Sequence, residues 1–318
     1  MGIIRAINIS EKRGTQKYPV ESAKLAEDWG IVGDAHGGRW HRQVSLLSYE
    51  KIEEFKQRGA ELTPGAFGEN LIVEGFDLRN LPVGTMFCCG EAILELSQIG
   101  KECHTHCQIY QRMGECIMPT EGVFAQVVKG GEIRVGDEIW IEESLTDKRL
   151  KAAVVTLSDK GAAGERPDES GPLAKELLEQ EGYRVVEMLL LADDIERLEI
   201  ELKRLADARQ VDLILTTGGT GFSHRDVTPE ATMHVATRNA PGIAEAIRAY
   251  SMQYTRRAML SRGVSVIRNN TLIVNLPGSP KAVRESLECV LPQLEHGIRI
   301  LKGSASDCAG IASVLPPH

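Results

Sequence analysis

The sequence predicts two domains of different classes: a β-rich, barrel-like domain over residues 1–145 and a three-layer α/β domain with a mainly parallel sheet over residues 150–303, with a tail over 304–318. Three observations predict this division. The first half consists of many short strands with one clear helix, the second half alternates strands with helices, and a polar run at 142–149 separates them. At 318 residues the chain is long enough for two cores.

Short apolar runs that end at glycine or polar residues predict the strands of the first domain. Many short strands with few helices favour a closed or sandwiched β-structure. The predicted strands lie at 3–9, 84–88, 92–96 and 138–141, and helical spacing predicts one helix at 49–58.

Strands and helices alternate in the second domain, which favours a parallel sheet with helices on both faces. We expect Ser170 to cap the first helix and Gly182 to end it, and Thr228 to cap a later helix that opens with Pro229. Ligands of such sheets bind beyond the carboxyl ends of the strands. The predicted strands are 152–157, 184–191, 211–216 and a hairpin at 264–276 that turns at Asn269-Asn270; the predicted helices are 171–180, 195–208, 229–237, 243–254 and one from residue 281.

Charge and composition exclude several classes of protein. The net charge is −8, and residues 1–147 carry all of it, with 15 basic and 23 acidic side chains. An acidic first half argues against a nucleic-acid-binding protein, which needs a basic face. We see no signal peptide and no apolar run long enough for a transmembrane helix, and the seven cysteines are too unevenly placed for a secreted disulfide framework. We therefore expect a cytoplasmic protein that binds neither membrane nor nucleic acid.

A predicted buried strand runs into a loop with three glycines in four residues, Thr217-Gly218-Gly219-Thr220-Gly221. Glycine permits positive φ, so successive N–H groups can point into one hollow that suits a phosphate. The loop matches neither the Walker A pattern nor Gly-x-Gly-x-x-Gly, and the lack of the latter disfavours a nicotinamide oxidoreductase. On the glycines alone, a plain tight turn is an equal alternative.

Acidic residues lie near the same predicted edge of the sheet. Asp226 precedes the helix start at Thr228-Pro229, where it either helps to cap the helix or presents a carboxylate that could hold Mg²⁺ against phosphates. Asp193, in the run Ala192-Asp193-Asp194-Ile195, is equally open to a capping role or a catalytic role.

A second loop, Asn275-Leu276-Pro277-Gly278-Ser279, repeats the strand–loop–helix pattern. The N-terminus of the following helix can bind an anion through its backbone. Lys281 in the first turn opposes the helix dipole, which predicts an anionic partner for this side chain. The loops at Ser158-Asp159 and Asp168-Glu169-Ser170-Gly171 complete a rim of similar loops.

In this order, the motifs resemble the molybdopterin adenylyltransferases of the MogA, MoaB and gephyrin type. The resemblance covers residues 154–302 and includes Ser261-Arg262-Gly263 and residues 226–230 besides the two glycine loops. The family transfers AMP from ATP to the terminal phosphate of molybdopterin and releases pyrophosphate. The resemblance therefore implies molybdopterin and ATP with Mg²⁺ as small-molecule partners, and a homotrimer.

The resemblance also implies roles for individual residues. Asp226 and Asp193 would form the catalytic and Mg²⁺-binding pair. The expected contacts to molybdopterin and nucleotide are Ser158, Asp159, Ser170, Thr217, Gly218, Gly219, Thr220, Gly221, Ser261, Asn275, Pro277, Gly278, Ser279 and Lys281.

Five of the seven cysteines lie between Cys88 and Cys116, and three interpretations of Cys103-His104-Thr105-His106-Cys107 stay open. The thiols and imidazoles could bind zinc, although no distant second ligand pair stands out. The thiols could instead be buried and structural, or one of them could be reactive.

A second resemblance favours the reactive thiol. The runs at 33–36, 42–46, 68–71 and 98–103 resemble a MOSC domain, the β-rich module found in molybdenum-cofactor sulfurases, over about residues 1–142. The cysteine characteristic of that family falls on Cys103, which would act as a thiolate ligand of the molybdenum cofactor or as a persulfide carrier. The candidates to line its pocket are His36, Arg42 and Asn70, with Asp34 and Glu69.

Together the resemblances predict a fused protein for late molybdenum-cofactor assembly, with other proteins of that pathway or molybdoenzymes as partners. The alternative is a carrier or scaffold that binds pterin without turnover. Release of pyrophosphate from ATP and molybdopterin would separate these two functions.

Overall fold

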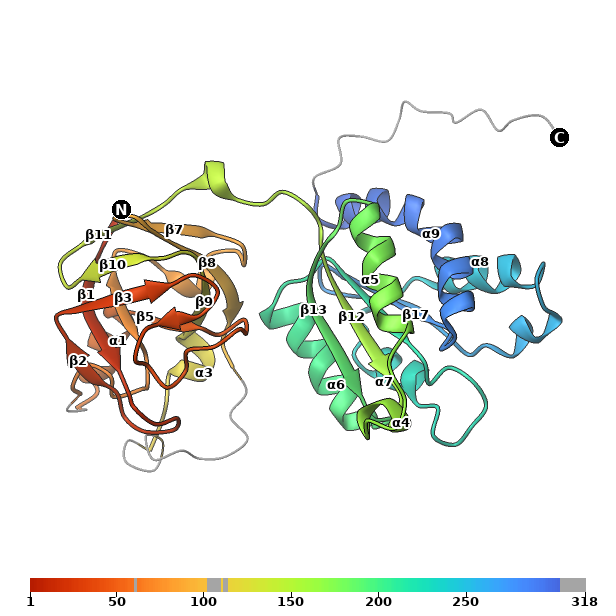
Figure 1. Ribbon diagram of the computed structural model, residues 1–318, viewed down its shortest axis with the longest axis horizontal. Helices are drawn as coiled ribbons and strands as arrows, with labels where there is room; N and C mark the ends of the chain where they lie inside the picture. The colour runs from red at the N-terminus through yellow and green to blue at the C-terminus, as the bar shows by residue number, and fades with distance from the viewer. Residues whose placement is uncertain (60–61, 102–109, 111–113, 304–318) are drawn as a thin grey trace. The chain divides into compact units, whose positions relative to one another are not determined.

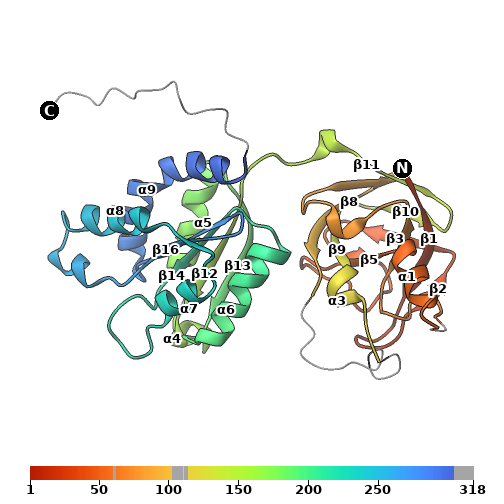
Figure 2. The same ribbon diagram turned by 180° about the vertical axis from the view of Figure 1, so that it is seen from behind.

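A computed structural model describes residues 1–59, 62–101, 110 and 114–303 of the protein (Figures 1 and 2). The chain divides into two compact units, with the division between Lys148 and Arg149. Each unit has its own hydrophobic core.

The first unit contains a closed, seven-stranded barrel (Figure 1). Its strands follow the order β11-β7-β8-β9-β5-β6-β1, and the pairing of β1 with β11 closes the ring. Strands β5 and β6 pair in parallel and the other neighbours are antiparallel, so the barrel is mixed. The bounds are β1 Gly2–Ile9, β5 Val44–Ser48, β6 Leu71–Glu74, β7 Met86–Cys89, β8 Ala92–Ile99, β9 Val123–Lys129 and β11 Glu138–Ile141.

Smaller elements surround the barrel. Strand β2 (Tyr18–Val20) pairs with β1, and a separate sheet contains β3 (Ser22–Ala26), β4 (Gly30–Ile31) and β10 (Gly131–Arg134). Within the described ranges of this unit, α1 (Tyr49–Lys56) and α3 (Met118–Glu121) are α-helices, and Leu78–Asn80 and Glu143–Leu145 form short 3-10 helices. Ile4, Leu46, Leu71, Leu94 and Val123 are buried in the barrel, because alternate residues of each strand face inward. The predicted barrel-like class is confirmed.

The second unit is a six-stranded sheet between two layers of helices (Figure 2). The strand order is β13-β12-β14-β17-β16-β15. The first four strands are parallel to one another, and β16 runs antiparallel to both of its neighbours, β17 and β15. Helices α5, α8 and α9 cover one face, and α6 and α7 cover the other. The strands are β12 Lys151–Leu157, β13 Arg184–Leu191, β14 Leu213–Thr217, β15 Arg238–Asn239, β16 Ser265–Arg268 and β17 Thr271–Leu276; the helices are α4 Asp159–Ala162, α5 Ser170–Gln180, α6 Ile195–Lys203, α7 Thr228–His234, α8 Pro241–Ser251 and α9 Pro280–Leu301.

This arrangement confirms the predicted α/β class and puts the carboxyl ends of β12, β13, β14 and β17 at one edge. The predicted helix at 195–208 is α-helical only over Ile195–Lys203, and its remaining residues, Arg204–Ala208, form a π-helix. Among the described residues, no helix is both long enough and apolar enough to cross a membrane.

Two predicted helix caps are wrong by one residue. Ser170 and Thr228 are the first residues of α5 and α7 rather than their N-caps. The N–H groups of Ser170 and Gly171 donate to the Asp168 carboxylate, which does the capping that was expected of the serine. The Ser170 and Thr228 hydroxyls instead donate to the Gly278 and Gly218 carbonyls.

Candidate functional site

A cavity of about 410 Å³ opens at the carboxyl edge of the parallel strands in the second unit. Loops that follow β12, β13, β14 and β17 all contribute to its wall, as the fold class predicts. The predicted residues that line it are Ser158, Ser170, Asp193, Thr217, Gly218, Gly219, Asp226, Gly278 and Ser279.

The first glycine loop needs glycine at two of its positions. Gly218 has φ of +93° and Gly219 has φ of +61°, both in the left-handed region that favours glycine. A Cβ on Gly219 would lie 2.3 Å from the Thr228 hydroxyl oxygen, and one on Gly218 would lie 2.3 Å from the Leu157 carbonyl oxygen. The two positions therefore combine an unusual backbone conformation with close packing, which a simple tight turn does not require.

Three hydroxyl groups tie the glycine loops to each other and to the neighbouring helices. Thr217 Oγ1 donates to the Pro277 carbonyl over 2.7 Å, which joins the two loops directly. Ser170 Oγ donates to the Gly278 carbonyl and Thr228 Oγ1 donates to the Gly218 carbonyl, each over 2.9 Å. These three bonds cross-link the two loops with α5 and α7.

The two adjacent aspartates after β13 have separate roles. Asp194 caps α6, because its Oδ1 accepts the Arg197 N–H over 2.8 Å. Asp193 does not cap the helix and instead lines the cavity, where its Oδ2 accepts the Asp159 N–H over 3.2 Å. Burial raises the pKa of Asp193, and the negative charges of Asp159 and Asp226 add to this effect.

The carboxylates of Asp193 and Asp226 form an oxygen donor set that fits Mg²⁺. Asp193 Oδ1 is buried and has no hydrogen-bond partner among the described residues, so a ligand would have to satisfy it. Asp226 Oδ2 accepts only the Ser223 N–H in the described part of the chain. Mg²⁺ is usually held by one or two carboxylates together with substrate phosphates, as this pair would allow.

Other predicted contact residues lie outside the cavity lining. Asn275 is buried and links the sheet to α7 through the hydroxyls of Thr216 and Thr232. Lys281 is exposed and lies 3.8 Å from Glu285 in its own helix. The remaining ones are Asp159, Thr220, Gly221, Ser261 and Pro277.

Asp159 lies beside the cavity and is paired with a cation. Arg225 donates two hydrogen bonds to the Asp159 carboxylate, over 2.9 and 2.7 Å. Asp159 Oδ1 also accepts the Asp193 N–H, so the loops after β12 and β13 hold each other in place. The negative charge of the Asp159 carboxylate contributes to the raised pKa of Asp193.

Sequence reasoning missed Arg166, the sole basic side chain among the described residues that line the cavity. It lies between α4 and α5, where four acidic side chains also line the wall: Asp168, Glu169, Asp193 and Asp226. No glycine motif or helix signal marks this arginine, so only its position in the folded chain identifies it.

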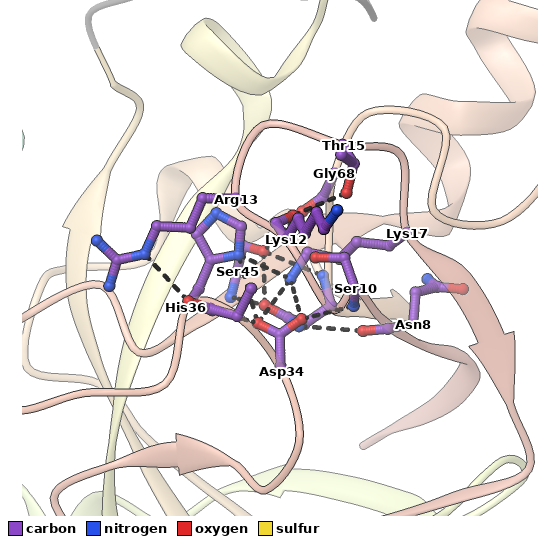
Figure 3. Close-up of polar contacts among 12 residues, drawn as sticks. Asn8, Ser10, Lys12, Arg13, Thr15, Lys17, Asp34, His36, Ser45 and Gly68 are labelled. Atoms are coloured by element: carbon purple, nitrogen blue, oxygen red, sulfur yellow. Dashed lines mark hydrogen bonds and ion pairs between the residues drawn. The ribbon is translucent and has the colours of Figure 1, made fainter.

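The first unit holds a buried ion pair that sequence reasoning also missed. Lys17 Nζ lies 2.8 and 2.9 Å from the two Asp34 oxygens, and both side chains are 1% exposed (Figure 3). His36 Nδ1 lies 3.4 Å from Lys17 Nζ, and the Ser10 N–H donates to Asp34 Oδ1. Burial alone would raise the pKa of Asp34, but its contacts with His36 and Lys17 hold that pKa well below its usual range. Burial lowers the pKa of Lys17 despite the attraction of Asp34.

The predicted residues of this unit have different surroundings. Asn70 is buried and cross-links strands: its Oδ1 accepts from Ser45 and its Nδ2 donates to the Asn8 carbonyl. The Arg42 guanidinium lies 4.9 Å from the centre of the Trp40 ring. Cys103 and the neighbouring His104, His106 and Cys107 lie outside the described residues, so the zinc and thiol interpretations stay predictions. Among the described cysteines, Cys88, Cys89 and Cys289 are free thiols.

Comparison with known protein families gives two matches. Residues 153–296 match the family described as "Probable molybdopterin binding domain", and residues 33–140 match the MOSC domain. A molybdopterin adenylyltransferase of Helicobacter pylori is 39% identical over 157 residues, which cover 49% of this chain and 89% of that protein. The molybdopterin adenylyltransferase of Escherichia coli K12 is 41% identical over 143 residues, covering 44% and 73% respectively.

Solved structures match the same half of the chain. The molybdopterin biosynthesis enzyme MoaB from Thermus thermophilus is 44% identical, with a TM-score of 0.47, and the match covers 48% of this chain and 97% of that one. The two adenylyltransferases are 39% and 41% identical to this chain over 89% and 73% of their own lengths, which shows a shared family. The chain therefore belongs, through its second unit, to the molybdopterin adenylyltransferase family, and its first unit carries a MOSC domain.

Proposed function

We propose that the second unit transfers AMP from ATP to the terminal phosphate of molybdopterin, as part of molybdenum-cofactor biosynthesis. One observation carries the proposal: the two glycine loops, Asp193 and Asp226 line a single cavity in a domain about 40% identical to curated molybdopterin adenylyltransferases. In this reaction a phosphate oxygen of molybdopterin attacks the α-phosphorus of ATP. The bond from that phosphorus to the bridging oxygen breaks, and pyrophosphate leaves with its electron pair.

The chain's own residues position the reactants rather than form a covalent intermediate. The backbone of Gly218 and Gly219 and the facing loop at Gly278 line the cavity where phosphate groups would lie. Arg166 supplies positive charge at the wall. Phosphoryl transfer depends mainly on such positioning and on charge stabilisation. Because the loops are already held by the hydroxyl bonds, little reorganisation is needed when substrates bind.

Asp193 and Asp226 would hold Mg²⁺ in this site. When bound, the ion would neutralise charge on the phosphates of ATP. The raised pKa of Asp193 favours its protonated form at low pH, so metal binding should weaken as the pH falls.

The proposal is tested by pyrophosphate release from the full chain with ATP, Mg²⁺ and molybdopterin. We expect ATP- and molybdopterin-dependent release by the wild type. Asp226→Asn should lower the rate by about 100-fold or more, because it removes a carboxylate charge at the site of transfer. The matched control is Asp207→Asn, which changes an aspartate of the same unit that pairs with Arg268 and does not line the cavity.

Two outcomes would contradict this assignment. Wild-type turnover in Asp226→Asn would refute the role of Asp226. Binding of molybdopterin by the wild type without pyrophosphate release would favour the carrier or scaffold function instead.

For the first unit, we propose binding of the molybdenum cofactor or handling of sulfur at Cys103. The MOSC match, the buried pair of Lys17 and Asp34, and the half-buried His36 beside that pair support this proposal. Mass spectrometry of Cys103 after incubation with a cysteine desulfurase tests it: a persulfide on Cys103 indicates sulfur handling, and an unmodified thiol leaves cofactor binding as the proposed role.

A further inference from the structure

Asp226 lies on an exposed loop, and the structure shows one side chain that holds that loop. Arg262 Nε donates to the Gly221 carbonyl over 2.6 Å, and its Nη2 donates to the Asp226 carbonyl over 2.5 Å. Its backbone N–H donates to the Thr220 carbonyl over 3.0 Å. Arg262 thus contacts the loop at its beginning and at the aspartate itself.

A fourth contact joins the same guanidinium to the helix after the loop. Arg262 Nη1 pairs with the carboxylate of Glu230, in the first turn of α7. The planar guanidinium can donate to three separate acceptors at once, whereas the ammonium group of lysine cannot match that fixed geometry. The loop and the start of α7 are therefore fixed by a single planar group.

Arg262 is itself anchored to the rigid part of the second unit. The Gly263 carbonyl accepts a hydrogen bond from Arg248 of α8 over 2.7 Å, and the Val264 N–H donates to Asn275 Oδ1 of β17 over 3.1 Å. These bonds fix the backbone on the C-terminal side of Arg262 to a helix and to a central strand. A rigid support of this kind is needed to hold a reacting group on a loop in place.

We infer that Arg262 is a positioning residue of the adenylyl-transfer site, which fixes the Asp226 carboxylate toward the cavity without contacting the substrates. The inference rests on the proposed function and names a residue on which the geometry of that site depends. Arg262 does not line the cavity among the described residues, whereas Asp226 does. Its loss should therefore affect turnover rather than substrate binding.

The test compares Arg262→Lys with a matched control, Arg268→Lys, in the full chain. Arg268 also uses its guanidinium for several bonds, to the Asp207 carboxylate and to the Val235 carbonyl. It pairs with Thr271 at the start of β17, whereas the cavity lies beyond the end of that strand. The two variants thus lose comparable guanidinium bonds, one near the carboxyl ends of the parallel strands and one near their amino ends.

We expect Arg262→Lys to lower kcat for pyrophosphate release by about 100-fold, because a shift of about 1 Å in a reacting group has an effect of that size. The KM values for ATP and molybdopterin should change less than about threefold, as expected when an interaction of the transition state is lost. Arg268→Lys should keep the wild-type kcat and KM, even though both variants lower the Tm of the chain.

A second variant serves in case Arg262→Lys does not fold. Glu230→Gln leaves Arg262 in place and removes the charge of its partner in α7, so it should lower kcat by about tenfold, again with little change in KM. Wild-type kcat in a folded Arg262→Lys, or in Glu230→Gln where the first variant is unfolded, would overturn the inference. An equal loss in Arg268→Lys would reduce the effect to general destabilisation and would also overturn it. No pyrophosphate release from the wild type would instead overturn the proposed function, and this inference with it.

Discussion

Single side chains in the first unit show how burial changes proton binding. Glu69 is 1% exposed, and burial raises its pKa to about 7 even though the N–H groups of Gly65 and Phe67 donate to its carboxylate. An ordinary glutamate, and Glu69 in the unfolded chain, titrates near 4.5. Between these two pH values the folded state binds more protons than the unfolded state, so Glu69 makes stability fall as the pH rises.

We predict that Glu69→Gln removes this fall. Between pH 4.5 and pH 8, the difference in free energy of unfolding between the variant and the wild type should shift by about 3 kcal/mol in favour of the variant. Urea unfolding followed by tryptophan fluorescence measures this, because all three tryptophans, Trp29, Trp40 and Trp140, belong to the first unit. Glu91→Gln, at an exposed turn, is the control. The same pH dependence in wild type and Glu69→Gln would contradict the account.

The buried pair of Lys17 and Asp34 has the opposite effect at low pH. The pKa of Asp34 is held below its usual range, so the stability that this carboxylate contributes is present above its unfolded pKa and is lost as the pH falls through the folded one. Removing one partner alone would leave a buried charge without its partner and would cost about 3–5 kcal/mol.

At the level of elements, the glycine loops are the part of the site with the least freedom to change. Gly219 carries two constraints, a φ of +61° and a hypothetical Cβ 2.3 Å from the Thr228 hydroxyl oxygen. Gly182, which ends α5, carries only the first, with a φ of +84° and no neighbouring atom within 4 Å of its hypothetical Cβ. The two glycines therefore separate backbone strain from steric exclusion.

We predict that Gly219→Ala lowers the free energy of unfolding of the second unit by about 2–4 kcal/mol and abolishes pyrophosphate release. Gly182→Ala should cost about 1 kcal/mol, from the left-handed backbone alone, and should keep the activity. Thermal unfolding and the pyrophosphate assay measure both effects. Equal losses of stability in the two variants would show that the contact with Thr228 has no role.

The elements of the second unit could be predicted from the sequence because their signals are local. The apolar run of β12 and the glycine after α5 each specify structure within a few residues. The same holds for the hairpin turn at Asn269, which has φ of +51°. The N-caps of α5 and α7 could not be predicted to the residue. The Ser170 hydroxyl donates to Gly278 and the Thr228 hydroxyl donates to Gly218, and both partners are distant in sequence from the helix start.

The site itself could be predicted only in part. The glycine loops, Asp193 and Asp226 carry family motifs, and they all line one cavity. No motif along the chain marks Arg166. Arg262 lies in the motif Ser261-Arg262-Gly263, but its bond to the Asp226 carbonyl depends on how two separate loops fold together. Asn275 matched the family motif, yet its contacts in this structure lie within the sheet and with α7.

At the level of the whole molecule, two units with separate cores match two family models, a probable molybdopterin binding domain and a MOSC domain. The curated relatives match less than half of the chain and lie within the second unit. We expect the covalent link to raise the effective concentration of a shared, labile intermediate. The predicted homotrimer, cytoplasmic location and partner proteins stay predictions.

The central claim is that one cavity at the edge of a single sheet binds both phosphate-bearing substrates beside Asp226. A crystal structure of the full chain soaked with AMP and molybdopterin tests this claim most directly. We predict phosphate density in contact with Gly219 and Gly278 and within reach of the Asp226 carboxylate. Density for either ligand at a separate surface, with the cavity containing only solvent, would contradict the account.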